Sequence, residues 1–180
     1  EANRPRLSGF GAQGAPYNGA NRVVKVTDES GTEERFYGRL GEVVKTIKTV
    51  ASDTGKKPEI YTSLFEYDTW NRLQKLTYPD GEVLTNRYDS GGLLREITGT
   101  KSGQNYKYLN RLEYDKFDQR ALVEYGNKTR TRYSYNEYNR RLATLQAGVG
   151  AGQGKLFQDL TYDYDNVGNI LGQANHAAIK

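Results

Sequence analysis

The sequence predicts an all-β fold, a repeat ribbon of antiparallel β-hairpins that forms a curved sheet or a partial spiral shell. Three observations lead to this prediction. The 180 residues include 15 Tyr and 20 Gly, which suit pleated strands and turns, respectively. Apolar residues recur with the period of two that is typical of a strand. A Tyr-Asp motif also returns along the chain, which is typical of a repeat architecture.

Seven copies of the motif share the order Tyr, Asp, two variable positions, Gly or Asn, one variable position and an aliphatic residue, with the looser copies departing from it in part. The leading tyrosines, here called anchors, are Tyr17, Tyr37, Tyr67, Tyr88, Tyr114, Tyr135 and Tyr164. They lie 20, 30, 21, 26, 21 and 29 residues apart, so short and long units alternate. The sequence therefore divides into a Gly-rich lead-in segment at 1–16, tandem hairpin repeats at 17–173 and a tail at 174–180.

Each unit is predicted to contain a strand, a turn and a strand. Short units have tight turns at Gly31, Gly81 and Gly126, whereas long units have longer connections at 51–58, 99–104 and 146–155. In the strands that lead into the anchors, aromatic and aliphatic residues fall on positions of one parity, and an example is the set Tyr106, Tyr108, Leu112 and Tyr114. One face of the sheet is therefore expected to be aromatic, and the opposite face to be polar.

The motif has a physical explanation as a strand end. The anchor Tyr is expected to cap its strand and to stack on the equivalent Tyr of neighbouring units. The next residue accepts backbone N–H groups in an Asx-type turn, and the four aspartates that recur there are Asp68, Asp89, Asp115 and Asp165. Gly or Asn four positions after the anchor supplies a positive φ. Because one unit cannot bury its apolar face alone, stability is expected to come from stacked neighbours.

Catalytic and metal-binding chemistry is not expected from these residues. The chain has no Cys and one His, His176, so neither a thiolate nucleophile nor a zinc site is favoured. A glycosidase needs two carboxylates that face each other across a substrate, but the aspartates repeat at one turn position. Residues 163–168 resemble the start of a calcium loop, yet Val167 and Ala174 stand where oxygen ligands are needed. The sequence predicts no enzyme activity, no cofactor and no metal.

Binding functions remain as alternatives. The charge of +4 is spread along the chain without a basic block, which argues against nucleic-acid binding. No window approaches the roughly 18 consecutive apolar residues of a membrane-spanning helix. The Gly-rich stretch 148–155 lacks the spacing of a phosphate-binding loop. Trp70 is a candidate ligand contact, because an exposed aromatic ring beside Asn and Arg can stack on a sugar, although packing between repeats is the more conservative interpretation.

The segments Tyr67-Asp68-x-x-Asn71-Arg72-Leu73 and 162–170 resemble the repeat of the rearrangement-hotspot (Rhs) or YD-repeat family. The resemblance extends over about residues 17 to 173. There are departures, since Gly38 replaces the Asp and Arg120 and Arg141 replace the aliphatic residue, which predicts a one-residue register shift in those two units. The family includes bacterial polymorphic toxins, shell components of insecticidal toxin complexes, wall-associated proteins and the animal teneurins. The resemblance implies a β-hairpin ribbon that spirals into a hollow shell around a C-terminal toxic domain.

We therefore expect a non-enzymatic structural module, an arc of such a shell that encloses or scaffolds a toxin or surface domain of a larger secreted or cell-surface bacterial protein. Its expected partners are further repeats and a C-terminal effector domain of the parent chain. The given sequence shows no copy of the Asp-Pro-containing motif that marks the self-cleaving end of the toxin shells, so autoproteolysis is not expected of it. Edge-to-edge self-association is also expected, because an isolated arc leaves two unpaired sheet edges. The alternative is a carbohydrate- or ligand-binding module that uses exposed aromatic residues and long loops.

Overall fold

The computed structural model describes residues 18–52, 57–150 and 155–177, and within those ranges every regular element is a β-strand. The strands are β1 (Lys25–Asp28), β2 (Gly31–Tyr37), β3 (Val43–Val50), β4 (Glu59–Tyr67), β5 (Leu73–Thr77), β6 (Val83–Tyr88), β7 (Leu94–Lys101), β8 (Gln104–Tyr114), β9 (Arg120–Tyr125), β10 (Thr129–Tyr135), β11 (Leu142–Val149), β12 (Leu156–Tyr164) and β13 (Ile170–Asn175). The all-β prediction is confirmed.

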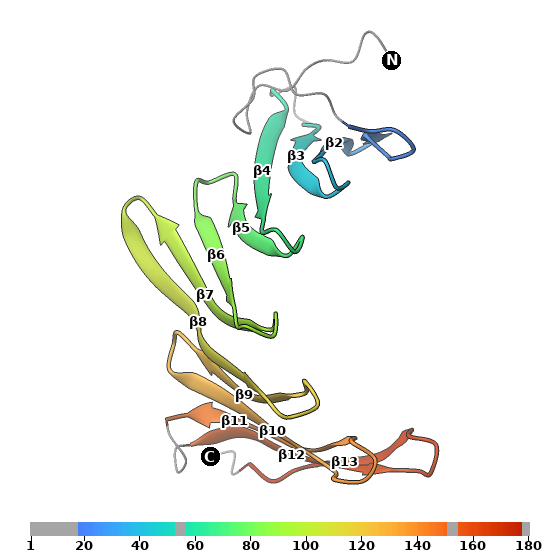
Figure 1. Cartoon of the computed structure of the whole chain (residues 1–180), viewed down its shortest axis with the longest axis vertical. Coiled ribbons are helices and arrows are strands. Elements are labelled where there is room, and N and C mark those ends of the chain that lie inside the picture. The colour runs from blue at the N-terminus through green and yellow to red at the C-terminus, as the bar shows by residue number, and fades with distance from the viewer. Residues whose placement is uncertain (1–17, 53–56, 151–154, 178–180) are drawn as a thin grey trace. The chain divides into compact units, whose positions relative to one another are not determined.

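The strands join one 13-stranded sheet in the same order as in the chain, so each strand pairs with its neighbours in sequence (Figure 1). Every pairing whose register is described is antiparallel. Two kinds of connection alternate along this meander. The anchor turns, defined as residues 38–42, 68–72, 89–93, 115–119, 136–141 and 165–169, follow the even-numbered strands. All other hairpin connections follow the odd-numbered strands and lie at the opposite ends of the strands.

Contacts divide the chain into two compact units, residues 1–85 with 100–104 and residues 86–99 with 105–180. In the first unit, Phe36 of β2 is buried, and Val24, Val44 and Ile47 pack against it. The cluster is small because a single sheet layer offers few neighbours above each side chain.

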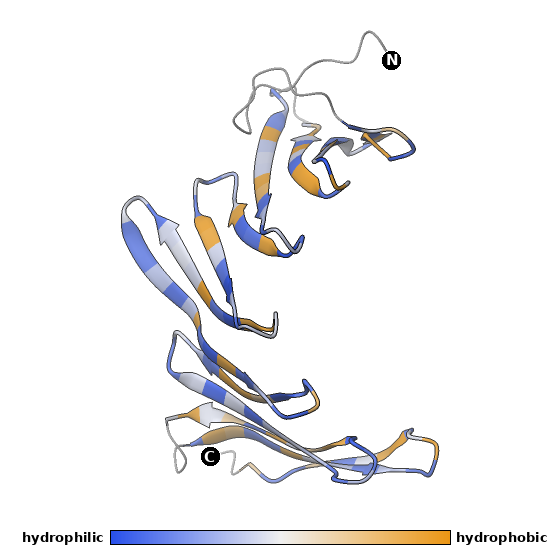
Figure 2. Cartoon of the chain, viewed as in Figure 1, coloured by the Kyte–Doolittle hydropathy of each residue, from blue (hydrophilic) through white to orange (hydrophobic). Residues whose placement is uncertain are grey.

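In the second unit, Leu109, Leu112 and Val123 form the buried cluster, and the partly buried residues packed against it are Leu94, Ile97, Tyr114 and Tyr133. No large side chain among the described residues is completely buried. Figure 2 shows hydrophobic and hydrophilic residues interleaved along the strands rather than gathered in one deep core. Because burial is this shallow, hydrogen bonds between hairpins must contribute much of what orders the sheet.

The aromatic parity predicted for β8 is wrong in its first half. Leu109 and Leu112, which have opposite parity, are both buried, whereas Tyr108 is 47% exposed. The cause is a bulge: the register with β9 shifts between Leu109 and Arg111, so Asn110 is an extra residue and the alternation reverses. The Asn110 amide donates to the Tyr125 carbonyl oxygen at 3.2 Å, which provides a partner for that backbone group.

The connection predicted at 99–104 is also different. β7 continues to Lys101 and β8 begins at Gln104, so only Ser102 and Gly103 form the turn. Both have positive φ, 50° and 78°, as in the tight turns that suit the twist of a hairpin. This long unit therefore gains its length from longer strands. Residues 53–56 and 151–154 of the other two long connections lie outside the described residues.

The limits of the repeat segment can be compared with the strands only in part. The lead-in at 1–16 and the first anchor, Tyr17, lie outside the described residues. At the other end, β13 runs to Asn175, two residues beyond the predicted end of the repeats at 173. The His176 amide then donates to the Asp159 carbonyl oxygen at 2.7 Å, so backbone bonding continues into the segment predicted to be a tail.

Candidate functional site

The repeated feature of this molecule is the anchor turn. Each described anchor is the last residue of its strand, and the chain reverses direction in the residues that follow it. At Tyr67 the register with the next strand shifts, because Tyr67 pairs with Leu73 whereas Glu66 pairs with Lys75. The same irregularity stands at the ends of β2, β8, β10 and β12. A bulge at the turn strengthens the local twist of each hairpin.

The aspartate after the anchor holds the turn together with its carboxylate. Asp68 Oδ1 accepts the amides of Trp70 at 2.9 Å and Arg72 at 3.0 Å. Asp115 Oδ1 accepts the amides of Phe117 and Gln119 at 2.8 and 3.0 Å. The equivalent oxygens of Asp89, Asp165 and Asn136 also accept backbone amides of their own turns. These side chains therefore act as local acceptors in the Asx-type geometry.

The charge state of these carboxylates follows from the same bonds. Burial raises the pKa of Asp68. The hydrogen bonds from the Arg72 side chain and from the Arg72 and Trp70 amides lower the pKa by more than burial raises it, so the pKa lies below the ordinary 3.8. The Asn169 side chain and three backbone amides hold the pKa of Asp165 below its ordinary value. A glycosidase acid needs a raised pKa. Asp68 and Asp165 are shifted in the opposite direction.

Gly38 replaces the aspartate in one unit, and Glu42 supplies the missing carboxylate. Glu42 Oε2 accepts the Leu40 amide at 2.8 Å, the bond that Asp68 makes to the residue two positions on. A Cβ atom at Gly38 would lie 1.9 Å from Glu42 Oε1. The Glu42 side chain thus occupies the space that an aspartate side chain would need. The turn still has a carboxylate acceptor, which comes from the last residue of the turn instead of the first.

The positive φ of the turn falls four residues after the anchor in five turns, at Gly41, Asn71, Gly92, Asp118 and Gly168. In the Tyr135 turn it falls on Arg140, five residues after the anchor, with φ of 61°. Tyr135 accordingly pairs with Leu142, seven residues on, whereas Tyr114 pairs with Arg120, six residues on. The predicted one-residue shift is confirmed for the unit with Arg141 and wrong for the unit with Arg120.

The anchors contact the preceding unit through their hydroxyl groups. Tyr67 Oη donates to the Val43 carbonyl oxygen at 3.0 Å. Tyr135 Oη donates to the Arg120 carbonyl oxygen at 2.9 Å. Tyr37, Tyr114 and Tyr164 make the same bond to Val23, Leu94 and Leu142, respectively. Val43, Leu94, Arg120 and Leu142 are each the first residue after the preceding anchor turn, so these hydroxyls link successive hairpins at equivalent points.

Two adjacent arginines join three successive anchor turns of the second unit. Arg140 Nη2 pairs with Asp115 Oδ2 of the preceding turn at 2.5 Å, and its guanidinium stacks on the Phe117 ring at 3.6 Å. Arg141 donates to the carbonyl oxygens of Asp165 at 2.6 Å and Asn166 at 3.1 Å in the following turn. Sequence reasoning noted Arg141 only as a departure from the motif. The sequence feature that could have indicated this role is the pair of consecutive arginines in the longer turn after Tyr135.

The remaining candidates form no site of their own. Trp70 lies at an anchor turn, 77% exposed, with the Arg72 guanidinium 6.0 Å from its ring centroid. His176 lies beside Thr161, with Nε2 3.1 Å from the hydroxyl. No cluster of three or more metal-ligating side chains occurs in the described ranges. No helix in those ranges is long and apolar enough to span a membrane.

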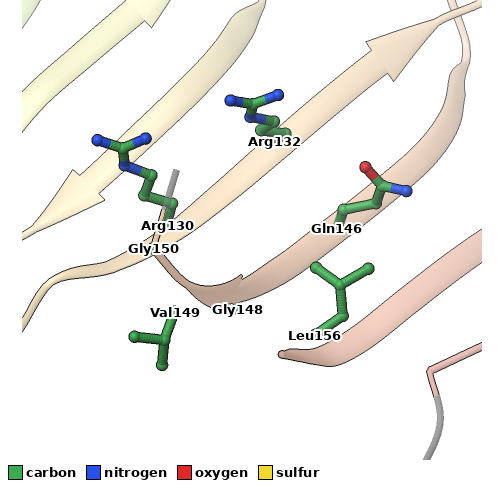
Figure 3. A pocket seen from close by; sticks show the side chains of 7 residues that line it. All are labelled: Arg130, Arg132, Gln146, Gly148, Val149, Gly150 and Leu156. Atoms are coloured by element: carbon green, nitrogen blue, oxygen red, sulfur yellow. The ribbon is translucent and has the colours of Figure 1, made fainter. Parts of the chain in front are cut away.

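One hollow of about 110 Å³ is lined by residues of β10, β11 and β12. Figure 3 shows Arg130 and Arg132 side by side on one face there. Arg130 pairs with Glu124 at 2.5 Å, and Gln146 donates to Asp159 at 3.0 Å. Two of its polar groups are therefore already engaged within the sheet. The hollow is also far smaller than the several hundred cubic ångströms of an ordinary ligand site.

Sequence and structure comparisons agree with this architecture. Toxin subunit YenC1 of Yersinia entomophaga is 33% identical over 124 residues, 67% of this chain, and YenC2 of the same organism is 28% identical over 169 residues, 91% of the chain. The crystal structure of TcdB2-TccC3-Cdc42 superposes with a TM-score of 0.76 at 26% identity over 88% of the chain. The Tc holotoxin pore of Photorhabdus luminescens gives the same TM-score at 27% identity.

The chain belongs to the Rhs/YD-repeat family. No profile of a known protein family matches it. The match covers 13% of YenC1, 16% of YenC2 and 8% of the solved chains. The chain thus corresponds to a small part of these toxin-complex proteins, a part built from YD hairpins.

Proposed function

We propose that this chain is a non-enzymatic structural module, an arc of a YD-repeat shell that encloses a toxic domain of a larger secreted bacterial protein. The observation that carries the proposal is the hydroxyl bond of the anchors. Five anchors each tie a hairpin to the preceding one at the same backbone position. Such a repeated link extends a sheet hairpin by hairpin, as a wall requires, and it places no reactive group toward a substrate.

The carboxylates support the structural role. Asp68, Asp115 and Asp165 bind the backbone of their own turns, and their lowered pKa keeps them as ionised acceptors. The homology to toxin-complex subunits supplies the second support, because those relatives are themselves parts of toxin complexes. The partners under this proposal are further YD hairpins and an effector domain of the same polypeptide.

The test is protease protection of the full-length polypeptide that contains this segment. If the repeats enclose the effector region, a protease will cut that region only after the repeats are unfolded by denaturant. The matched control is the effector region expressed alone, which should be cut without denaturant. Equal cleavage of the enclosed and isolated regions would refute the enclosing role. A glycan array with the present chain tests the carbohydrate alternative, and a purely structural module should give no signal.

A further inference from the structure

Gly168 leaves room for an arginine of the preceding turn, because it has no Cβ atom. The Arg141 guanidinium lies over the Tyr164 ring, with Cζ 5.7 Å from the ring centroid. A Cβ atom on Gly168 would stand 3.1 Å from Arg141 Nη2 and 3.2 Å from Cζ, closer than ordinary van der Waals contact. The same guanidinium donates to the carbonyl oxygens of Asp165 and Asn166 at 2.6 and 3.1 Å. The turn after Tyr164 therefore forms a site that fits a guanidinium.

The first unit has the same arrangement at Gly41. The Arg22 guanidinium lies 5.5 Å from the centroid of the Tyr37 ring, and a Cβ atom on Gly41 would overlap Arg22 Nη2. Residues 18–22 follow the first anchor, and Asn21 among them has the positive φ, 56°, of an anchor turn. Arg22 closes that turn and contacts the next one, which is what the arginine of the second unit also does.

The last residue of each turn is matched in sequence to the positive-φ residue of the next turn. Glycine follows each turn that ends in arginine, in the pairs Arg22–Gly41, Arg72–Gly92 and Arg141–Gly168. A residue with a side chain follows each turn that ends otherwise, in the pairs Glu42–Asn71, Leu93–Asp118 and Gln119–Arg140. Conformation alone does not require the glycines, since Asn, Asp and Arg adopt a positive φ at the equivalent position of the other turns.

Turns that end in another residue make a different contact. Gln119 Nε2 donates to the Arg140 carbonyl oxygen at 2.9 Å, a backbone group that is present whatever the side chain. Glu42 accepts the Leu40 amide of its own turn. Neither contact needs the face of a tyrosine ring or the space of a missing Cβ atom. A side chain at the positive-φ position of the next turn is therefore compatible with these two endings.

We propose that a glycine at the positive-φ position makes an anchor turn a binding site for arginine, and that the partner it fits is a YD hairpin whose own turn ends in arginine. The anchor ring offers its negative face to the guanidinium, and in the Tyr164 turn two carbonyl oxygens accept its N–H groups. A guanidinium displaced by a Cβ atom loses these contacts, because they depend on its position over the ring. The match thus contributes to which hairpins fit side by side. It concerns hairpins of this chain and does not depend on the enclosing role.

The test is a double-mutant cycle on the present chain, measured by urea unfolding. Gly168→Asn adds a Cβ atom but keeps a residue type that adopts a positive φ, as Asn71 does, and Arg141→Gln gives the ending found at Gln119. Gly168→Asn should lower the folding equilibrium constant at least about fivefold more in the wild-type chain than in Arg141→Gln, because only the wild-type chain has a bound guanidinium to displace. Circular dichroism of each variant checks that it folds.

Gly81→Asn is the matched control, because Gly81 also has a positive φ, 84°, but nothing lies within 4 Å of an added Cβ atom. Its effect should be the same with and without Arg141→Gln. The cycle of Gly41→Asn with Arg22→Gln repeats the test in the first unit and decides it if Gly168→Asn does not fold. A coupling of at least about fivefold at Gly168 with none at Gly81 supports the proposal. A smaller coupling at Gly168, or an equal one at Gly81, overturns it.

Discussion

Removal of a single anchor hydroxyl tests whether these bonds stabilise the sheet. Tyr164→Phe deletes the 2.9 Å bond to the Leu142 carbonyl oxygen and leaves the ring in place. A neutral hydrogen bond contributes a net of about 1 kcal/mol, so the free energy of unfolding should fall by about that amount. With a urea m-value of about 2 kcal/mol per molar, the midpoint should move down by about 0.5 M. Far-ultraviolet circular dichroism during urea titration measures this shift.

Tyr162→Phe is the matched control on the same strand. The Tyr162 ring stacks with Tyr164 at 6.4 Å, and no hydroxyl bond is described for it. Loss of the Tyr162 hydroxyl should therefore change the free energy of unfolding by less than about 0.3 kcal/mol, within the usual range for a neutral surface change. If the two phenylalanine variants are equally stable, the anchor hydroxyls do not link the hairpins energetically, and the physical basis of the proposed wall fails.

Three further predictions follow from the anchor turns. Tyr67→Ala should cost about 3 kcal/mol, as for truncation of a largely buried aromatic side chain. Asp68→Ala should cost clearly less, because it removes only the hydrogen bonds within its turn. Equal and negligible losses in urea titrations would contradict the capping role. Arg141→Ala should lower the thermal midpoint more than Arg132→Ala, because Arg141 binds two carbonyls of the next turn and Arg132 is an exposed strand residue. The reverse order in calorimetry would contradict the claim that Arg141 stabilises the sheet by joining two turns. The folded-state pKa values of Asp68 and Asp165 lie below the ordinary 3.8. The two carboxylates should therefore stabilise the fold above pH 3.8, and this contribution should be lost as pH falls through the lower folded-state pKa values. Urea midpoints that stay constant from pH 7 into that acidic range would show that the carboxylates make no such contribution.

The parts of the fold that depend on neighbours in sequence were predictable. An anchor, an acceptor one residue later and a positive φ four residues later lie within one turn, so their spacing is visible in the chain itself. The alternation of short and long units followed from the anchor spacing, although the connection predicted at 99–104 is a two-residue turn. Asp68 and Asn71 have the local roles that their residue types suggest, as an acceptor and as a left-handed residue.

The candidate site was only partly predictable, because its partners are separated by a whole hairpin. The Arg140–Asp115 pair and the Tyr164–Leu142 bond join residues 25 and 22 positions apart, respectively. Which residues meet at that distance depends on strand register, and one bulge changes it, as Asn110 does in β8. The Glu42 carboxylate that replaces an aspartate at Gly38 is a further example, since it reaches the turn from the opposite side.

The sequence by itself determined that this chain repeats a β-hairpin, where the anchor turns lie and which aspartates accept backbone amides there, because those properties follow from short-range hydrogen bonding and from the period of the strand. The tertiary structure alone decided how one hairpin joins the next. The hydroxyl acceptors, the two-residue turn at Ser102 and Gly103 and the arginines that join successive anchor turns all depend on register. Register is set by the balance of many weak cross-strand contacts along whole strands, and no single stretch of residues contains that balance.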